Sequence, residues 1–343
     1  MGVNLRDLVP KTTVSLRDLG GKSIAIDAYN ALYQFLAIIR QPDGTPLKDH
    51  TGRVTSHLSG LLYRTASLVE MGMKPVYVFD GTPPALKEVE IKRRLRVKQE
   101  ATISYERALK AGRVEEAHKY AQATSRLKDY MTEDSKRLLD SIGIPWIQAP
   151  SEGEAQAAHV AKKRDTNYCA SQDYDSLLFG APILVRNVTL SGRRKLPGKK
   201  LYVEVVPEIV DLEQTLAQLE ITHEQLVDIG ILVGTDYNPD GIKGIGPKTA
   251  LKLIRNHGSL DKTPNLDEAD FPVPPQRIRQ IFLQPKVTDN YELEWRKPDA
   301  ERVVDFLCGE RDFSEDRVEK ALEKMSCGLK ELREKTTLEQ FFG

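Results

Sequence analysis

Acidic side chains stand at the ends of four short apolar runs of the chain. They are Asp27, Asp80, Glu152, Glu154, Asp173 and Asp175. Like charges in a cluster raise one another's pKa unless cations neutralise them, so a site built from these acids needs cations. The ligands are all oxygen, with no His or Cys interleaved, which favours Mg²⁺, with Mn²⁺ as a plausible substitute, over Zn²⁺. Two such ions can activate water and stabilise the leaving oxygen during attack on a phosphodiester, so the pattern predicts metal-dependent phosphodiester hydrolysis.

Sequence motifs for other active sites are absent. The chain has no Gly-x-Ser-x-Gly elbow, no His-Glu-x-x-His helix and no Gly-x-x-x-x-Gly-Lys phosphate loop. Its cysteines, Cys169, Cys308 and Cys327, lie far apart, in no zinc pattern and in no disulfide framework. Hydrolysis without a protein nucleophile therefore remains the chemistry that the sequence favours.

The elements that must position the acids are β-rich runs that alternate with helical patterns. The runs span residues 23–26, 76–79, 144–147, 168–170 and 183–185. Such alternation predicts an α/β fold with a mostly parallel central sheet flanked by helices. Ligands of these sheets bind at the carboxyl ends of the strands, where the acids stand. We therefore expect the acids to converge at one edge of one sheet.

Each acid taken alone also has a structural interpretation. Aspartates at strand ends often start turns or cap the next helix. Residues 151–154 read Ser-Glu-Gly-Glu, which fits a capping box in which Glu154 only ties down a helix start. Asp236 has the weakest pattern, because it follows a helix and precedes a loop. The recurrence of acids at one sheet edge is what favours a site.

Composition indicates a globular protein, with 29% charged and 40% hydrophobic residues in a chain of 343. No apolar run approaches a membrane span, the first residues lack a signal-peptide pattern, and Arg6 stands where a myristoylation signal has Ser or Thr. We expect an intracellular protein without a membrane partner. The net charge of zero counts against a simple basic nucleic-acid binder unless the opposite charges are separated in space.

A highly charged helical segment without a strand pattern runs from about Lys87 to Arg137. It lies between the second and third strands, so we expect an insertion that projects from the core. Its basic residues include Lys87, Lys92, Arg93, Arg94, Arg96 and Lys98, against Glu88, Glu90 and Glu100. A cationic arm could draw a single strand past the acids, whereas the same charges could instead form i to i+4 ion pairs on a solvated helix. The basic stretch at 193–200 is interpreted as a solvated hairpin tip.

A glycine-rich segment at residues 241–250 reads Gly-Ile-Lys-Gly-Ile-Gly-Pro-Lys-Thr-Ala and opens a helix. Its glycines let backbone amides approach an anion at the helix start, and Pro247 suits the first helical turn. We interpret it as a helix-hairpin-helix that binds a DNA backbone without reading its sequence. The contacts expected are Lys243, Gly244, Gly246 and Lys248. The alternative is a plain glycine-rich turn.

Six separated motifs make the chain resemble the flap endonucleases, members of the structure-specific 5' nuclease superfamily, over nearly its full length. They are Ile26-Asp27-Ala28-Tyr29 with Tyr33-Gln34-Phe35-Leu36, Phe79-Asp80-Gly81-Thr82-Pro83-Pro84, residues 149–155, Ser171-Gln172-Asp173-Tyr174-Asp175, Gly234-Thr235-Asp236-Tyr237 and the glycine hairpin. Together they are highly specific. The resemblance implies a two-metal site formed by Asp27, Asp80, Glu152, Glu154, Asp173, Asp175 and Asp236.

Further residue roles follow from the same resemblance. It implies that Lys87 and Arg94 face the scissile phosphate from the insertion, which the family uses as a helical arch over the displaced strand. It implies that Tyr33 stacks on a base near the cut. In the family, Arg40 and Thr55 belong to a pocket for a one-nucleotide 3' flap, in a loop that varies.

The end of the chain resembles a sliding-clamp peptide. Leu338, Phe341 and Phe342 are spaced to share one face of a helical turn and to fill a pocket on the clamp. Lys335 departs from the family's pattern because Gln usually holds this place, which leaves the anchoring polar contact in doubt. The alternative is a frayed terminus, although two exposed phenylalanines favour a partner.

The activity implied by the resemblance is 5' flap cleavage with associated 5'–3' exonuclease activity, in Okazaki fragment processing and DNA repair. The partners implied are branched DNA and a sliding clamp, and we expect a monomer. Because the chain stops after the aromatic pair, we expect an archaeal source and a cytoplasmic or nucleoid location.

Three other functions stay open. Within the superfamily, an exonuclease or a junction resolvase shares the acids and the hairpin. A non-catalytic module that presents branched DNA to the clamp would lack ligands, whereas none of the seven acids is replaced. A phosphatase with a covalent aspartate would use Asp173-Tyr174-Asp175, but it leaves the glycine hairpin without a role.

The domain organisation is predicted as follows. A nuclease core spans residues 1–260, with an N-terminal part at 1–98, an arch at roughly 87–137, and an internal part at 116–258 that holds the helix-hairpin-helix at 238–257. A C-terminal helical region spans 261–330, and the clamp-binding tail spans 331–343.

Overall fold

The computed structural model of the chain describes residues 2–41, 43–113, 126–190, 192–195, 202–264 and 273–342, together with the single residues 116, 120, 124, 266 and 271. Its side-chain description of the last helix ends at Lys330. The strands are β1 Thr12–Thr13, β2 Ser23–Asp27, β3 Lys74–Phe79, β4 Trp146–Gln148, β5 Tyr168–Ala170, β6 Ile183–Arg186, β7 Gly192–Lys195, β8 Tyr202–Val205 and β9 Glu208–Asp211.

The helices are α1 Ala28–Ile38, α2 Ser56–Glu70, α3 Glu88–Lys110, α5 Asp129–Ser141, α6 Gly153–Lys162, α7 Asp175–Leu178, α8 Leu212–Leu219, α9 His223–Val233, α10 Pro247–His257, α11 Pro275–Leu283, α12 Ala300–Val304 and α13 Glu315–Phe342. Short turns of other helix types are η1 Leu16–Leu19, η2 Ala85–Lys87, η4 Leu260–Lys262 and η6 Asp305–Gly309. No helix among the described residues is both long and apolar enough to span a membrane.

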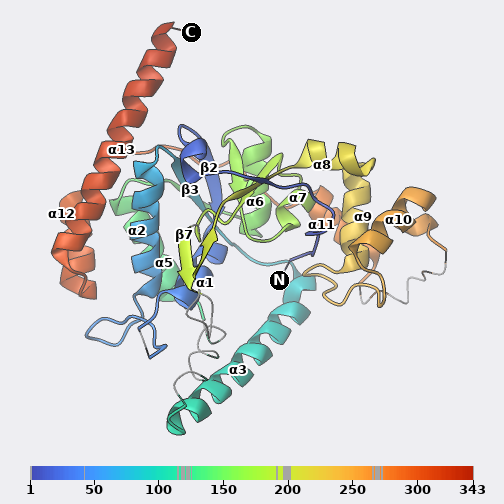
Figure 1. Cartoon of the computed structure of the whole chain (residues 1–343), viewed down its shortest axis with the longest axis horizontal. Helices are drawn as coiled ribbons and strands as arrows, with labels where there is room; N and C mark the ends of the chain where they lie inside the picture. Colours follow the sequence, from blue (N-terminus) through green and yellow to red (C-terminus); the bar gives the residue numbers. More distant parts are fainter. Residues whose placement is uncertain are drawn as a thin grey trace.

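A seven-stranded sheet runs through the centre of the molecule in the order β1-β9-β6-β5-β2-β3-β4 (Figure 1). The strands from β6 to β4 are parallel, and β9 and β1 add an antiparallel edge. The expected α/β fold with a mostly parallel sheet is therefore confirmed. The strand β4 begins at Trp146 rather than at residue 144, because Ile144 donates its amide to the Leu139 carbonyl and closes the end of α5.

Helices cover both faces of the sheet, and successive residues of each strand alternate between two cores. In β3, Val76 and Val78 pack with α6, α7, α9 and α11, whereas Tyr77 and Phe79 pack with α1, α2, α5 and α13. A parallel strand buried on both faces needs an apolar run of this kind. The sheet edge that carries the strand ends is thus held rigidly from both sides.

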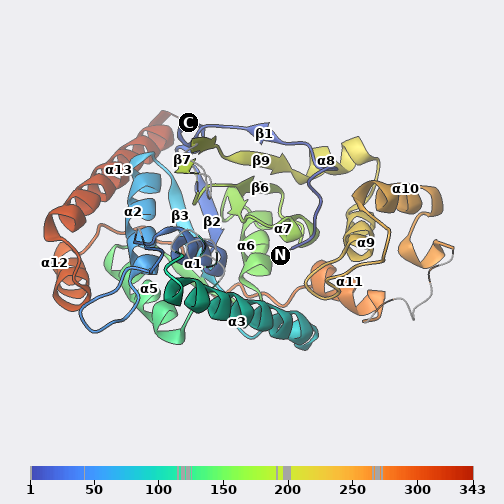
Figure 2. The same ribbon diagram turned by 60° about the horizontal axis from the view of Figure 1, so that its bottom comes forward.

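The charged segment after β3 forms the long helix α3. Figure 1 shows α3 projecting away from the sheet, and Figure 2 shows it crossing the molecule next to α1. Its side chains Val89, Val97 and Ile103 are exposed. The expected projecting insertion is present over α3, and its start contacts the sheet edge through Lys87 and Arg94. Residues 129–137, which were expected to belong to it, instead form part of α5, where Met131 and Asp134 are buried.

Candidate active site

The carboxyl ends of the parallel strands open into a pocket of about 350 Å³ beneath α3. Six of the predicted acids line it: Asp27, Asp80, Glu152, Glu154, Asp173 and Asp236. The seventh, Asp175, is buried behind them, with 5% of its surface exposed. The pocket wall also contains the three predicted non-acidic residues Tyr33, Lys87 and Arg94. The structure therefore brings the predicted acids together in one cavity.

Strand register places the first two acids. Asp27 is the last residue of β2 and caps α1, since its Oδ1 accepts the Asn30 amide at 3.0 Å. Asp80 follows β3, the parallel neighbour of β2, and its Oδ1 accepts the Gly153 amide at 2.6 Å. Because neighbouring parallel strands end at one edge, both carboxylates emerge there.

The next two acids come from the first turn of α6. Glu152 is the N-cap residue of this helix but makes no capping bond with its side chain. The Oε1 of Glu154 accepts hydrogen bonds from the Ser176 amide at 3.1 Å and from its hydroxyl at 2.5 Å. Glu154 therefore reaches across to α7, and the capping box that would explain it as a purely local feature is not formed.

The start of the chain holds two further acids in place. The Gly2 amide donates to Asp173 Oδ1 at 3.2 Å, and the Val3 amide donates to Asp175 Oδ1 at 2.6 Å. A Cβ atom on Gly2 would lie 2.7 Å from Asp175 Oδ1, so only glycine fits. Sequence reasoning missed Gly2, because no local pattern shows where the first residues of a chain run.

Two basic residues of the insertion lie among the carboxylates. The Lys87 ammonium contacts Glu152 Oε1 and lies 3.0 Å from Asp236 Oδ2. The Arg94 guanidinium contacts Asp236 Oδ1 and donates from Nε to Glu90 Oε1 at 2.8 Å. The opposite charges are therefore paired here rather than separated, because the cations at the start of the insertion contact the acids of the pocket directly.

Burial and repulsion dominate the electrostatics of the acids. Burial and the charges of Asp80 and Asp173 raise the pKa of Asp27 to about 8. Burial, with like-charged neighbours, raises the pKa of Asp80 to about 6 and that of Asp175 to about 7. Asp236 differs: burial raises its pKa, but Lys87 and Arg94 outweigh burial and lower it overall. Asp236, which contacts both cations, is therefore stabilised as an anion, whereas burial and like charges outweigh Lys87 at Asp27, Asp80 and Asp175.

The donor set fits a hard divalent metal ion. All seven acids offer oxygen, and the Lys87 ammonium already occupies a cation position between Glu152 and Asp236. Within the part of the chain that the structure describes, no three His, Cys, Asp or Glu side chains are arranged to hold a metal ion as they stand. A metal ion held by these acids would compete with Lys87 and Arg94 for the oxygens of Glu152 and Asp236.

A buried tyrosine next to the last acid fixes the orientation of Glu152. The Tyr237 hydroxyl donates to Glu152 Oε2 at 2.6 Å, which leaves Oε1 facing Lys87. The Tyr237 ring is 3% exposed and packs edge-on against Phe282 of α11 at 5.5 Å between centroids. Sequence reasoning used Tyr237 only as part of a motif, because a contact to a carboxylate 85 residues away has no local signature.

Replacing Tyr237 with Phe should lower kcat for the predicted phosphodiester hydrolysis by about 10- to 100-fold. It should also raise the metal concentration needed for half-maximal rate, since the predicted ligand Glu152 loses its orienting donor. The control is Tyr291→Phe, because Tyr291 donates to Asp165 at the same distance, 2.6 Å, away from the pocket. An unchanged metal dependence in Tyr237→Phe would show that Tyr237 serves packing alone.

Apart from the glycine hairpin, the remaining predicted residues lie in the pocket, between α1 and α2, and at the end of the chain. Tyr33 projects from α1 into the pocket, where the Lys98 ammonium lies 4.2 Å from its ring centroid. Arg40 and Thr55 lie in the segment between α1 and α2, outside the pocket lining, and Arg40 donates to the Gly44 carbonyl at 2.9 Å. Leu338 and the two terminal phenylalanines have side chains outside the described residues.

The glycine hairpin connects α9 to α10 as expected. Pro247 opens α10, and Gly246 is its N-cap residue. Gly244 has a φ of +86°, and a Cβ atom on either Gly244 or Gly246 would meet no atom within 4 Å. The backbone at this helix start is therefore open to an anion, flanked by Lys243 and Lys248.

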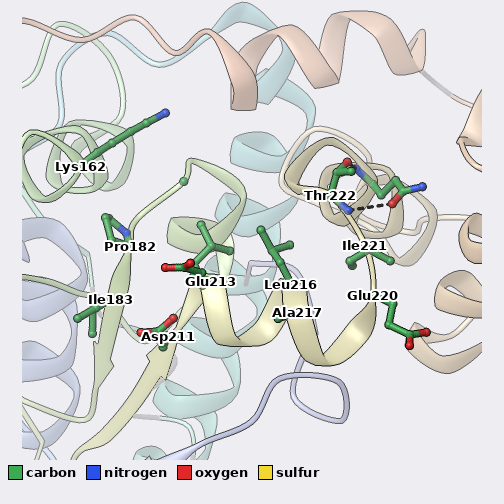
Figure 3. A pocket seen from close by; sticks show the side chains of 13 residues that line it. Lys162, Pro182, Ile183, Asp211, Glu213, Leu216, Ala217, Glu220, Ile221 and Thr222 are labelled. Atoms are coloured by element: carbon green, nitrogen blue, oxygen red, sulfur yellow. Dashed lines mark hydrogen bonds between the residues drawn. The ribbon is translucent and has the colours of Figure 1, made fainter.

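A larger cavity, of about 880 Å³, lies elsewhere, between the end of α6, the start of β6 and the helix α8 (Figure 3). Its lining includes Leu216, Ile221 and Lys162 but none of the predicted site residues. Cavity size therefore does not identify the candidate active site, which is the acid pocket because the predicted acids and cations line it.

Two family models match the chain. The XPG N-terminal domain matches residues 1–101, and the XPG I-region matches residues 143–236. These ranges contain the seven acids, Lys87 and Arg94. Fold, acid pocket and family models together define the class of the protein: it is an XPG nuclease, a class that depends on divalent metal ions.

Relatives that match almost the whole chain identify the family within this class. The protein "Flap endonuclease 1" of Hyperthermus butylicus is 56% identical, covering 96% of each chain. The solved structure of flap endonuclease-1 from Methanococcus jannaschii has a TM-score of 0.76 and 43% identity, covering 96% of this chain and 99% of the other. The catalytic core of Rad2 in complex with DNA substrate shares the fold, with a TM-score of 0.69, 23% identity and coverage of 95% and 100%. The chain belongs to the flap endonuclease family.

Proposed function

We propose that this protein is a magnesium-dependent, structure-specific endonuclease that cuts a 5' flap near the junction of single- and double-stranded DNA, with associated 5'–3' exonuclease activity. The observation that carries the proposal is the convergence of six acids in one pocket under Lys87 and Arg94. Relatives at 52–56% identity carry the name Flap endonuclease 1, which supports a role in Okazaki fragment processing and repair.

The side chains of the pocket have three different roles. Asp27, Asp80, Glu152, Glu154, Asp173, Asp175 and Asp236 hold two Mg²⁺ ions, which supply water activation and stabilisation of the leaving oxygen. Lys87 and Arg94 exchange part of their carboxylate contacts for the scissile phosphate. Tyr33 stacks on a base next to the cut. The chain's own contribution is to place the phosphate against the acids and to neutralise its charge.

The DNA is bound through its backbone. The open amides of the hairpin at Gly244 and Gly246, with Lys243 and Lys248, hold duplex phosphates. Arg40 and Thr55 belong to a separate pocket for a one-nucleotide 3' flap. The catalytic core of Rad2, which has the same fold, was solved in complex with a DNA substrate, and this supports DNA binding here. Branched DNA is thus bound on both sides of the cut.

The proposal also keeps the predicted domain division and the clamp-binding tail. The core spans 1–260, the helical region 261–330 and the tail 331–343, with the protein acting as a monomer in the cytoplasm or nucleoid. Helix α13 extends past Lys330 to Phe342 and leads away from the body of the molecule in Figure 1. This direction of the helix supports a tail that a clamp can reach.

Replacing Phe341 and Phe342 together with Ala should abolish the stimulation of cleavage by a sliding clamp, because the apolar plug is lost. The basal rate without clamp should stay within about twofold, since the acid pocket lies elsewhere. The measurement is the flap-cleavage rate with increasing clamp. A parallel loss of the basal rate would contradict this division of roles.

The experiment that tests the proposed activity compares 5' flap, nicked, single-stranded and four-way substrates, each with and without Mg²⁺. Flap cleavage should exceed the others and should vanish without the ion. Preferential cutting of four-way junctions would instead identify a junction resolvase, and binding without cleavage would identify a non-catalytic module.

A further inference from the structure

A second groove, of about 450 Å³, adjoins the acid pocket. Its walls come from residues 82–86, which connect β3 to α3, from the start of α6, and from α11 with the residues that follow it. The two cavities share Pro83, Ser151 and Glu152. A molecule bound at the acids can therefore continue directly into this groove.

Helix α11 presents one polar face to the groove. Arg277, Gln280 and Gln284 recur at intervals of three and four residues and line it together with Lys286. All four are exposed. The opposite face of the helix is buried through Ile278 and Phe282. Packing fixes the helix, so the polar face has a defined direction.

The cations of this face have no acidic partners within the described part of the chain, where no ion pair involves Arg277 or Lys286. Arg279, two residues on, provides the contrast: Asp228 binds its Nε, and Asp261 Oδ2 lies 2.8 Å from its Nη1. Arg279 thus forms ion pairs within the protein, while Arg277 faces the groove. Maintaining two unpaired cations in a concave surface suggests an anionic ligand.

The one acid in the groove wall is already engaged. Glu152 accepts from Tyr237 at one oxygen and from Lys87 at the other, on the side of the acid pocket. The groove side therefore offers two positive charges with amide and hydroxyl groups. Guanidinium, ammonium and amide donors at the surface of a groove suit the oxygens of consecutive phosphates.

We propose that this groove binds the phosphodiester backbone of the substrate DNA beside the cut, through Arg277 and Lys286 with Gln280 and Gln284. The proposal rests on the proposed function, because it assumes that DNA occupies the acid pocket. It adds a contact surface on α11 to the hairpin and the arch. Since the contacts are to phosphates, they strengthen binding without selecting a sequence.

The test is the double variant Arg277→Glu with Lys286→Glu. Its Kd for fluorescently labelled 5' flap DNA, measured without divalent ions at about 0.1 M salt, should rise at least about tenfold. The slope of log K against log salt should fall by about 1.4 to 1.8, because two phosphate contacts are lost. With Mg²⁺, the loss should be larger in kcat/KM than in kcat, since the lost contacts are to the backbone of the substrate.

The matched control is Lys297→Glu with Arg302→Glu, which makes the same change of charge at two exposed positions, one just before α12 and one within it. Its Kd should change less than about threefold, and equal losses in both variants would overturn the proposal in favour of net charge. A normal Kd in the α11 variant would also overturn it. Failure of the proposed function is distinct, because the wild-type chain would then not cut the flap.

Two DNA substrates show which part of the DNA backbone the groove binds. One substrate carries the 5' flap, and the other is the same nicked duplex without it. A loss of affinity on both places the contact on the duplex, whereas a loss on the flap substrate alone places it on the single strand. Either pattern supports a phosphate contact in the groove, and no loss on either contradicts it.

Discussion

Replacing Asp173 with Ala should lower the rate constant of flap cleavage by about three orders of magnitude or more while leaving the Kd for flap DNA within about threefold. The carboxylate lies in the acid pocket, where it is proposed as a metal ligand. Its removal should impair metal-dependent hydrolysis but leave the contacts to DNA phosphates in place. The measurements are single-turnover cleavage with Mg²⁺ and equilibrium binding without it.

Asp316→Ala provides the control for this variant. Asp316 is an exposed acid of α13 that pairs with Lys320, so its loss should change neither rate nor binding by more than about twofold. If Asp173→Ala cleaved at the wild-type rate, the residue would not belong to the metal site. A loss of binding equal to the loss of rate would indicate that Asp173 shapes the fold of the pocket.

Replacing Lys87 with Met should reduce kcat by about 100-fold or more, because the proposed function gives Lys87 the role of a cation at the scissile phosphate in the transition state. The same change should also lower the thermal stability of the protein in the absence of DNA. Burial lowers the pKa of Lys87, but Glu152 and Asp236 outweigh burial and raise it overall, so Lys87 is a cation that offsets the repulsion among the acids. The Tm without divalent ions should fall, and the rise of Tm on adding Mg²⁺ should be larger than in wild type.

The control for Lys87 is Lys92→Met, one turn further along the insertion. Lys92 is exposed and pairs only with Glu88 of its own helix among the described residues, so both rate and Tm should stay close to wild type. A Lys87→Met variant with normal kcat would remove the residue from the catalytic step. A normal metal-free Tm would show that the ammonium does not stabilise the acid cluster.

The fold and the strand-end acids followed from the sequence because they depend on local rules. Alternating apolar runs and helical patterns define a parallel sheet, and parallel strands end at one edge. Asp27 and Asp80 could therefore be placed together from the sequence alone. The same rule explains why Glu152 and Glu154, at the start of the helix after β4, face them.

Asp236 shows where local rules end. It follows α9 rather than a strand, and its position depends on a turn in which Asn238 accepts from the Thr235 hydroxyl at 2.7 Å and donates to the Ile231 carbonyl at 2.6 Å. Only the family resemblance singled it out from the sequence. Gly2 had no signal in the sequence, and Tyr237 entered only as part of a motif, because the partners of both residues are distant in sequence.

Opposite charges of this neutral chain pair where the insertion contacts the rest of the molecule. Lys87 and Arg94 neutralise carboxylates of the acid pocket, while Arg93 pairs with Asp240 next to the hairpin at 3.2 Å. The insertion is thus neither a free cationic arm nor a helix with internal ion pairs alone. Its basic residues connect it to the sheet edge, a result that charge counting could not give.

The central claim, that acids distant in sequence hold divalent ions together, is tested most directly by titrating the DNA-free protein with Mn²⁺ and counting bound ions by calorimetry. We expect saturable binding of two ions per chain, tighter at pH 8 than at pH 6, because the raised pKa values of Asp27 and Asp175, about 8 and 7, mean that protons must leave before the ions bind. Asp27→Asn with Asp173→Asn should lose this binding. Absence of saturable Mn²⁺ binding in the wild-type protein, or unchanged binding in that double variant, would contradict the claim.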